Sequence, residues 1–376
     1  GSPAKGLGQV TVGAVALASQ LVERVCALLG SPRGRVRPRR EQPPLPGAPA
    51  TSRLELDMYS LSGEHVGRVS VGAAAPGREL VERVRALLGS PRGIVKLLHG
   101  TRTLAESAPV AEQVLPGAGI QCLVVPVGEE QQQQVAQSVL RGEALGEDGW
   151  QVWDCVESLE DVSHVRDLTL PSALQHITFA SLRQSLDGVA FPTGLQTISF
   201  GHRFNQSLAR VVLPAGLRSI HFGVCFNQSL AGVALPGALQ SITFGPCFNK
   251  SLAGVALPGA LQSIHFGYRF NQSLAGIALP AELQSITFGE RFNQGLDGVA
   301  LPEALQSISF GGRFNQGLDG VALPAGLQNI TLGRDFNQSL AGVNLPGSLR
   351  RIRLDRRSRL DLGSARLPPG VEVVRY

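Results

Sequence analysis

Two histidines among hydroxyl side chains are the first candidates for chemistry in this sequence. His221 and His265 each stand in the segment Ser-Ile-His-Phe-Gly, and related segments carry Ser or Thr in place of the histidine. A Ser/His/Asp triad needs a carboxylate beside the imidazole, which orients the ring and stabilises its charged form. No Asp or Glu recurs beside these positions. The segments are therefore predicted to form a polar, uncharged face, and the chain is predicted not to be an enzyme.

Two cysteines are the second candidates. Cys225 and Cys247 occupy the same place in the related segments Gly-Val-Cys-Phe-Asn and Gly-Pro-Cys-Phe-Asn, and His202 stands nearby one segment earlier. If these segments belong to neighbouring strands about 4.8 Å apart, the two thiols lie within reach of a disulfide or a shared metal ion. A structural zinc site takes four ligands, however, and intracellular thiols usually stay reduced. We therefore predict no metal, no cofactor and no disulfide here.

Charge distribution and composition exclude several classes of protein. The net charge of the 376 residues is +5, but residues 347–376 alone hold eight arginines and three acidic residues. A basic excess confined to one end does not form a surface that tracks a duplex, so we predict no nucleic-acid partner. No run of 18 apolar residues is present, and we predict no membrane span. Residue 1 is Gly and the only methionine is Met58, so the N-terminus is expected to be incomplete.

An internal repeat supplies the elements that must position these residues. From Pro171 to Pro368 a proline recurs at a period of 22 residues, with one step of 21, and the unit reads P-x-x-L-Q-S-I-T-F-G-x-x-F-N-Q-S-L-A-G-V-A-L. A period this short is typical of a solenoid, in which each unit buries its apolar face against its neighbours. The predicted fold is mainly β, with about nine 22-residue coils.

The strand of each coil is indicated by alternation. Ile242 and Phe244 alternate with Ser241 and Thr243, which places Ile and Phe inward and the hydroxyl residues outward. Gly254 and Pro258 supply turns. The outward position after the isoleucine is predicted to be a partner-binding face, formed by Ser199, His221, Thr243, His265, Thr287, Ser309 and Thr331.

An asparagine follows the second phenylalanine of most units. Its side-chain amide can bond backbone groups of the adjacent coil where the chain leaves the strand, and such groups are costly to bury without a partner. The sequence predicts an inward-stacking structural ladder of Asn205, Asn227, Asn249, Asn271, Asn293, Asn315 and Asn337.

The pattern L-x-x-I-x-F followed by Asn resembles a leucine-rich repeat, and Phe-Asn-Gln units such as Phe270-Asn271-Gln272 resemble FNIP repeats of that superfamily. The resemblance covers roughly 171–368; the first unit departs from it, with Leu182-Arg183-Gln184 in place of Phe-Asn-Gln. It implies a rigid scaffold for protein recognition. FNIP-type repeats also occur beside F-box modules in ubiquitin-ligase adaptors, which implies a role in recruiting substrates.

Residues 54–125 carry a different pattern. Alternating residues predict strands at 54–61 and 66–71, a helix follows at 80–88, and apolar runs at 94–98 and 120–125 predict two further strands. This order, with the segment from Leu97 to Leu104, resembles a small α+β ubiquitin-like β-grasp domain. The chain continues past Val125 without a terminal Gly-Gly, which indicates a fixed domain and not a conjugated modifier.

The ubiquitin resemblance implies a partner-binding apolar patch. Short ungapped alignments place Leu61, Leu98 and Leu123 at the patch positions, and Leu123 is expected outward because Ile120, Cys122 and Val124 alternate inward. Exposed apolar clusters often mark contact sites. The patch is predicted to bind a ubiquitin-receptor module, and the alternative is that it packs against another part of the chain.

These patterns divide the chain into seven segments. Residues from Leu21 to Gly34 repeat those from Leu80 to Gly93 with one change, which indicates a truncated duplicate. In order, the segments are the duplicate (1–34), a Pro/Arg-rich linker (35–53), the ubiquitin-like domain (54–127), a linker (128–150), an N-terminal cap (151–170), the solenoid (171–346) and a C-terminal cap (347–376).

The sequence as a whole favours a non-enzymatic interaction scaffold or adaptor. The expected partner is a protein of unknown identity, with ubiquitin-receptor or ubiquitin-ligase components as the class that the resemblance implies. A monomer in the cytoplasm is expected, with the nucleus as the alternative because of the basic run at 35–40. The alternative function is a purely structural array without a dedicated ligand, since successive units are nearly identical.

Overall fold

The computed structural model describes residues 53–376 except residues 90, 101, 115–117, 144, 146, 147, 164–168, 181, 361 and 364. The chain divides into two units, Gly1–Pro126 and Val127–Tyr376. The predicted duplicate at 1–34 and almost all of the linker at 35–53 lie outside the described residues. Among those described, no helix has the length and apolar character that a membrane crossing requires.

The first unit holds a β-grasp-like domain. Its five-stranded sheet has the order β2-β1-β5-β3-β4, with β1 and β5 parallel and the other pairs antiparallel. The elements are β1 (Arg53–Ser60), β2 (His65–Gly72), α2 (Gly77–Leu87), β3 (Gly93–His99), β4 (Arg102–Thr103), α3 (Val110–Gln113) and β5 (Gly119–Pro126). The predicted order of hairpin, helix and two further strands is confirmed.

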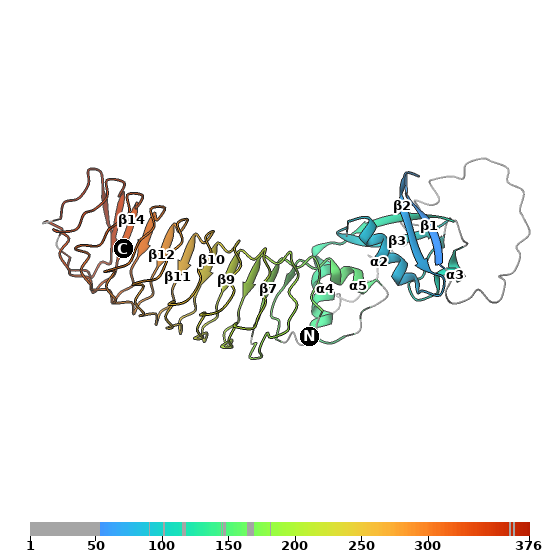
Figure 1. The fold of residues 1–376 in the computed structure, drawn as a ribbon, viewed down its shortest axis with the longest axis horizontal. Helices are drawn as coiled ribbons and strands as arrows, with labels where there is room; N and C mark the ends of the chain where they lie inside the picture. Colours follow the sequence, from blue (N-terminus) through green and yellow to red (C-terminus); the bar gives the residue numbers. More distant parts are fainter. Residues whose placement is uncertain are drawn as a thin grey trace, which may run out of the picture. The chain divides into compact units, whose positions relative to one another are not determined.

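Helix α2 covers one face of this sheet (Figure 1). Leu80, Val81 and Val84 are buried at helical spacing, and α2 contacts β2 and β3, which hold the buried residues Val71 and Val95. Burial of each such side chain stabilises the fold by roughly 1.5–3 kcal/mol. The chain turns after the helix at Gly89, whose φ of +72° lies in the left-handed region that glycine tolerates.

The second unit is a β-solenoid. Within the described residues of this unit, eleven strands, β6 to β16, form one parallel sheet in chain order, and they lie side by side along the coils (Figure 1). Equivalent residues pair directly, as Ile242 does with Ile264. The strands are β6 (Ser158–Leu159), β7 (His176–Thr178), β8 (Thr197–Ser199), β9 (Ser219–His221), β10 (Ser241–Thr243), β11 (Ser263–His265), β12 (Ser285–Thr287), β13 (Ser307–Ser309), β14 (Asn329–Leu332), β15 (Arg351–Leu354) and β16 (Glu372–Arg375).

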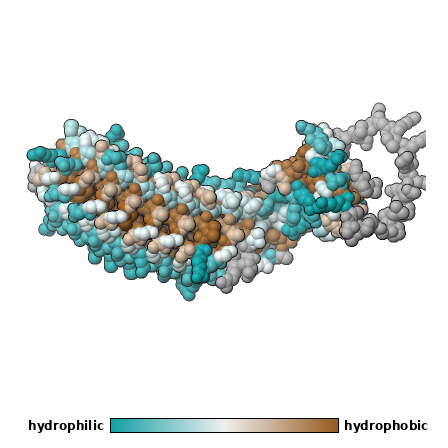
Figure 2. All heavy atoms as spheres, viewed as in Figure 1, coloured by the Kyte–Doolittle hydropathy of each residue, from teal (hydrophilic) through white to brown (hydrophobic). Residues whose placement is uncertain are grey.

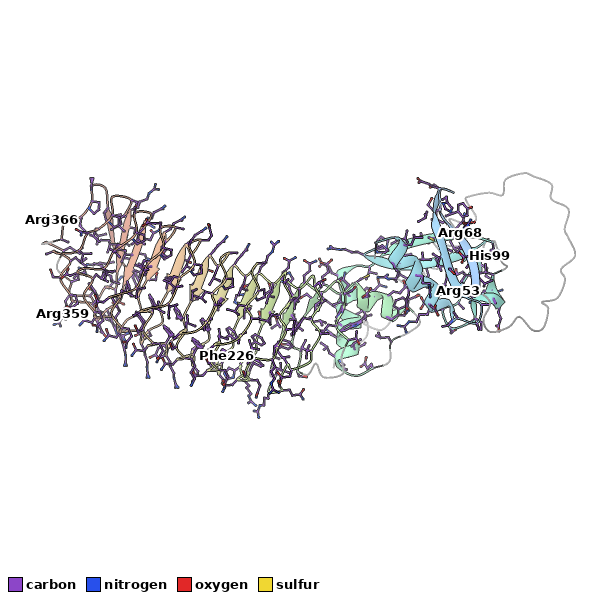
Figure 3. All side chains as sticks on the ribbon, viewed as in Figure 1. Arg53, Arg68, His99, Phe226, Arg359 and Arg366 are labelled. Carbon is purple, nitrogen blue, oxygen red and sulfur yellow. The ribbon has the colours of Figure 1, made fainter. Side chains whose placement is uncertain are left out.

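Each coil buries the residues that the repeat predicts. In the coil of β10, Ile242, Phe244 and Phe248 are buried, whereas Ser241 and Thr243 stay partly exposed. Phenylalanine rings stack both within a coil and between coils: the centroids of Phe266 and Phe270 lie 3.9 Å apart, and those of Phe248 and Phe270 lie 6.0 Å apart. Such contacts add about 0.5–1.5 kcal/mol beyond the burial of area. Phe226, labelled in Figure 3, belongs to the same stack.

A column of glycines lets consecutive coils approach each other. A Cβ atom built on Gly267 would collide with the carbonyl oxygen of Gly245, and the same clash repeats between Gly245 and Gly223. Only glycine leaves room for this backbone contact, so the glycine after each strand is a steric requirement of the stack.

The N-terminal end of the solenoid is covered by two helices, α4 (Glu129–Leu140) and α5 (Gly149–Asp154). Ala136 of α4 belongs to the buried core of the solenoid, and Leu140 and Trp153 pack against that core. The Trp153 Nε1 atom donates a hydrogen bond to the Thr169 carbonyl at 3.0 Å. The predicted linker at 128–150 is therefore wrong in part, because most of α4 consists of polar residues that gave no apolar pattern.

The C-terminal segment continues the sheet. Residues 347–376 were predicted to form a cap, but β15 and β16 extend the parallel ladder, with Arg351 paired to Glu372 in the register. Ile352 and Leu354 are buried as the equivalent residues of earlier coils are. The alternation of inward apolar and outward polar residues therefore continues into β15, where Arg replaces Ser and Thr at the outward positions.

Candidate interaction surfaces

The predicted strand face of the solenoid is formed in register. Thr243 of β10 pairs with His221 of β9 on one side and with His265 of β11 on the other. His265 is exposed, and the remaining positions of the predicted face are half-buried: Ser199, His221, Thr243, Thr287, Ser309 and Thr331. The sheet therefore presents a continuous column of hydroxyl and imidazole groups, which can donate and accept hydrogen bonds along seven coils.

The two imidazoles of this face differ in their surroundings. The Nε2 atom of His221 lies 2.9 Å from the Ser219 hydroxyl. Burial, together with the nearby His265, lowers the pKa of His221 below its ordinary value of 6.5. A lowered pKa keeps the ring neutral at physiological pH, so His221 takes part in hydrogen bonds without charge. In the part of the chain that the structure describes, no group of three side chains is arranged to hold a metal ion.

The asparagine ladder is present, with a correction to its position. The Oδ1 atom of each asparagine accepts the backbone N–H of the asparagine one coil later at 2.8–3.0 Å, without a break from Asn205 to Asn337. The side chains were predicted to stack inward, but they lie half-buried or exposed at the surface. Phenylalanine fills the core at this point of the coil, so the asparagine beside it bonds along the rim.

Glutamines reinforce the ladder, a role that the sequence interpretation missed. The Gln272 Nε2 atom donates to Asn249 Oδ1 at 3.0 Å, and Gln294 donates in the same way to Asn271 at 3.1 Å. Lys250 stands at the glutamine position of one coil, and no such bond reaches Asn227 among the described residues. The Phe-Asn-Gln signature was visible in the sequence, but a bonding role was predicted only for its second member.

Cys225 and Cys247 lie in equivalent loops of successive coils. Both thiols are free and half-buried. The backbone N–H of Cys225 donates to the His202 carbonyl at 2.9 Å, and that of Cys247 donates to the Val224 carbonyl at 3.0 Å. The loops are therefore held by backbone bonds from coil to coil.

The predicted leucine patch of the β-grasp-like domain is wrong at its centre. Leu98 is only 4% exposed, whereas Leu61 is 39% exposed and Leu123 is half-buried. β3 lies between β5 and β4, so residues on both neighbouring strands flank Leu98, which pairs with Gln121 and Thr103. Val124, expected inward, is 38% exposed although it belongs to β5, the central strand of the sheet.

The face around β1 and β2 is polar instead. Asp57 of β1 accepts two hydrogen bonds from Arg68 of β2, at 2.8 and 3.2 Å, and lies 3.4 Å from His65. The hydrogen bonds from Arg68 hold the pKa of Asp57 below its ordinary range. Arg53, Arg68 and His99 all come from this sheet, as Figure 3 shows. The domain thus presents charged side chains around its hairpin and no continuous three-leucine patch.

The stack of coils, with inward Leu, Ile and Phe and one parallel strand per coil, defines a leucine-rich-repeat-like solenoid. A scan against protein families matches the family described as "FNIP Repeat" at residues 183–225, 204–247, 248–291, 292–335 and 314–357. Residues 183–357 of the solenoid therefore match FNIP repeats.

Among solved structures, the chain is similar to CroV588, described as a novel circular LRR protein structure. The identity is 33% and the TM-score 0.52, and the match covers 58% of this chain and 32% of that chain. The chain thus spans about a third of the length of that structure. The search of curated proteins gave no match.

Proposed function

We propose that this chain is a non-enzymatic scaffold that binds a protein partner along its FNIP-repeat solenoid. The observation that carries the proposal is the rigid, in-register array of outward side chains over seven coils, from Ser199 to Thr331. Side chains fixed on a hydrogen-bonded frame lose little conformational freedom on binding, which favours affinity. Solenoids use such extended surfaces for recognition.

The finer proposal concerns the ubiquitin pathway. Its support is the presence of a β-grasp-like fold in the same chain as the repeats. This support is an analogy, since fold does not imply function. The buried Leu98 removes the predicted patch from this proposal. Exposed Leu61 and the charged hairpin residues are the groups through which the domain would contact a partner.

Cross-linking of the full chain in a lysate of its own cells, followed by mass spectrometry, tests the scaffold proposal. Each captured protein is purified and titrated against the full chain by calorimetry. Saturable binding with cross-links on the solenoid is the expected result. If no captured protein binds saturably, the alternative of a purely structural array is favoured, an alternative that the near-identity of the units supports.

A second titration separates the finer proposal. The full chain is titrated with a purified ubiquitin-receptor helix, and the Leu61→Ala variant serves as the comparison because Leu61 is exposed and contributes little to the core. Binding that weakens in the variant supports a ubiquitin-pathway role. Absence of binding at millimolar concentration contradicts it and leaves the solenoid proposal intact.

A further inference from the structure

One position of the repeat does not share the near-identity of the others. In the seven units that begin at Pro192 and end at Leu345, the residue directly after the column glycine is different every time. The position that follows it holds Arg, Cys or Asp. The first position is occupied in order by His202, Val224, Pro246, Tyr268, Glu290, Gly312 and Arg334.

We call these two positions in the seven coils the variable ridge. None of its residues is buried, and the exposed ones include Tyr268, at 47% exposure. The backbone beneath is fixed, since from Cys225 to Asp335 the N–H of each second residue donates to the carbonyl of the first residue one coil earlier, as Arg269 does to Pro246 at 2.9 Å. Diversity is thus concentrated where side chains project from a rigid frame.

Charge on the ridge is uneven. Arg269, Arg291 and Arg313 are exposed in three successive coils, and Arg291 lies over the Tyr268 ring at 5.5 Å. Within the described residues, Arg269 and Arg313 have no ion pair. Successive coils lie about 4.8 Å apart, so three like charges stand in line and repel each other.

The carboxylate in this line is already neutralised. Glu290 forms an ion pair with Arg334 and accepts the Gly312 backbone N–H at 2.9 Å. The three arginines therefore keep their capacity to bind an external carboxylate, which a guanidinium recognises through paired N–H donors. The two coils before Arg269 present Val224 and Pro246, and the coil of Arg269 itself presents the Tyr268 ring, so this end of the ridge is apolar.

We propose that the variable ridge binds an extended acidic segment of a partner protein, with a run of Asp or Glu against Arg269, Arg291 and Arg313 and an apolar side chain against the Pro246–Tyr268 end. This proposal rests on the scaffold function above and adds the variable ridge to the strand face as a contact site of the solenoid. A nucleic acid fits less well, because the line holds only three arginines and the next coil carries the Asp335 carboxylate at the same position of the repeat.

The test is a selection of random twelve-residue peptides on the immobilised full chain. Selected peptides are expected to carry at least three acidic residues next to an apolar one. One selected peptide is then labelled and titrated by fluorescence polarisation against the wild type and against the triple variant Arg269→Glu, Arg291→Glu, Arg313→Glu. The triple variant is expected to bind roughly tenfold more weakly or worse, as three exposed ion pairs are lost and reversed.

A matched variant with the same change of charge, Arg210→Glu, Arg218→Glu and Lys250→Glu, lies at exposed positions off the ridge and is expected to retain binding within about twofold. The triple change to Gln, checked by melting, covers the case in which the Glu variant does not fold. Equal losses in the two Glu variants, or selected peptides without acidic runs, overturn the proposal. So does a single-stranded RNA oligonucleotide that binds more tightly than the peptide and is lost in the ridge variant.

The two proposals fail separately. If the cross-linked partner binds the ridge variant as tightly as the wild type, the scaffold function stands and the ridge is not its site. If no partner is captured but acidic peptides bind the ridge, the ridge site stands and the scaffold proposal lacks its partner.

Discussion

The two units of this chain reach a stable core by opposite routes. In the β-grasp-like domain the Cys122 Sγ atom lies 3.9 Å from the Met58 Sδ atom across a separation of 64 residues, because the parallel strands β1 and β5 come from opposite ends of the domain. In the solenoid the recurring side-chain bond joins residues 22 apart, as from the Asn271 N–H to Asn249.

This difference sets how far a local change spreads. The five strands of the β-grasp-like domain share one core with α2, so loss of one contact weakens all of them together. In the solenoid each coil contacts only its neighbours, and stability is close to a sum of coil and interface terms. The solenoid can therefore vary one position without cost elsewhere, which is how the variable ridge coexists with nearly invariant coils.

The largest effect is expected from the glycine column. Gly267→Val places a branched side chain against the Gly245 carbonyl and forces two coils apart, which should destabilise the solenoid by roughly 4 kcal/mol or more. Gly259→Ala is the matched control, because its Cβ meets open space. Its effect should stay within about 0.5 kcal/mol. Urea denaturation monitored by far-UV circular dichroism measures both, and similar midpoints for the two variants would mean that the coils do not need the close contact.

Core truncations compare the two units directly. Leu80→Ala in α2 and Leu274→Ala in the solenoid each remove a fully buried leucine and should cost about 2–5 kcal/mol. Hydrogen exchange is expected to show lost protection over all of β1, β2, β3 and β5 in the first variant. In the second, the loss should be greatest at β11 and β12 and should fade towards β8 and β14. A uniform loss from β7 to β15 would contradict the additive picture.

The repeat made the solenoid predictable because its period, its alternation and its glycine are all local in the sequence. Ile242 and Phe244 need no knowledge of distant residues to be placed inward, and the same holds for the bond between successive asparagines. The bond made by the third residue of Phe-Asn-Gln was not predicted: Gln272 donates to Asn249 of the preceding coil. A polar residue gives no pattern that distinguishes this bond from exposure to water.

Burial in the β-grasp-like domain was harder to predict, since it depends on which strands meet. Leu98 was predicted to be exposed from its alignment with ubiquitin, yet β3 is flanked on both sides and the leucine is covered. Helix α4 was missed for a related reason: Ala136 and Leu140 are its residues that contact the core, and the preceding glutamines at 131–134 favour helix without an apolar stripe.

A smaller effect is expected along the asparagine ladder. Asn271→Ala removes the acceptor of both the Asn293 N–H and the Gln294 side chain and should cost about 1 kcal/mol. Gln272→Ala removes one exposed bond and should cost less, about 0.5 kcal/mol. Lys250→Gln should stabilise by about the same amount by supplying the bond that Asn227 lacks. Denaturation midpoints in the order Lys250→Gln, wild type, Gln272→Ala, Asn271→Ala are expected, and a wild-type midpoint above that of Lys250→Gln would count against the ladder.

The smallest expected effect is a difference in the pH at which each of the two units loses stability. Burial and His265 lower the pKa of His221 in the folded solenoid, so the unfolded chain binds the extra proton first as the pH falls below 6.5. The resulting stability is full above that value and is lost as the pH falls from 6.5 through the folded pKa. In the β-grasp-like domain Arg68 lowers the pKa of Asp57 from 3.8, and the corresponding loss begins only below that pH.

Acidification should therefore weaken the solenoid before the β-grasp-like domain. We expect the urea midpoint, measured by hydrogen exchange in the strands β8 to β12, to fall between pH 7.5 and 5.5. The midpoint measured in β1 to β5 should not change through titration of His221. The side chains beside His221 are those of the neutral residues Ser199, Ser219 and Thr243, with His265 beyond Thr243. His265→Gln should therefore reduce the pH dependence, and His221→Gln should reduce it further. A pH dependence that is the same in the wild type and in both variants would assign the effect to other residues and leave the two units alike in acid.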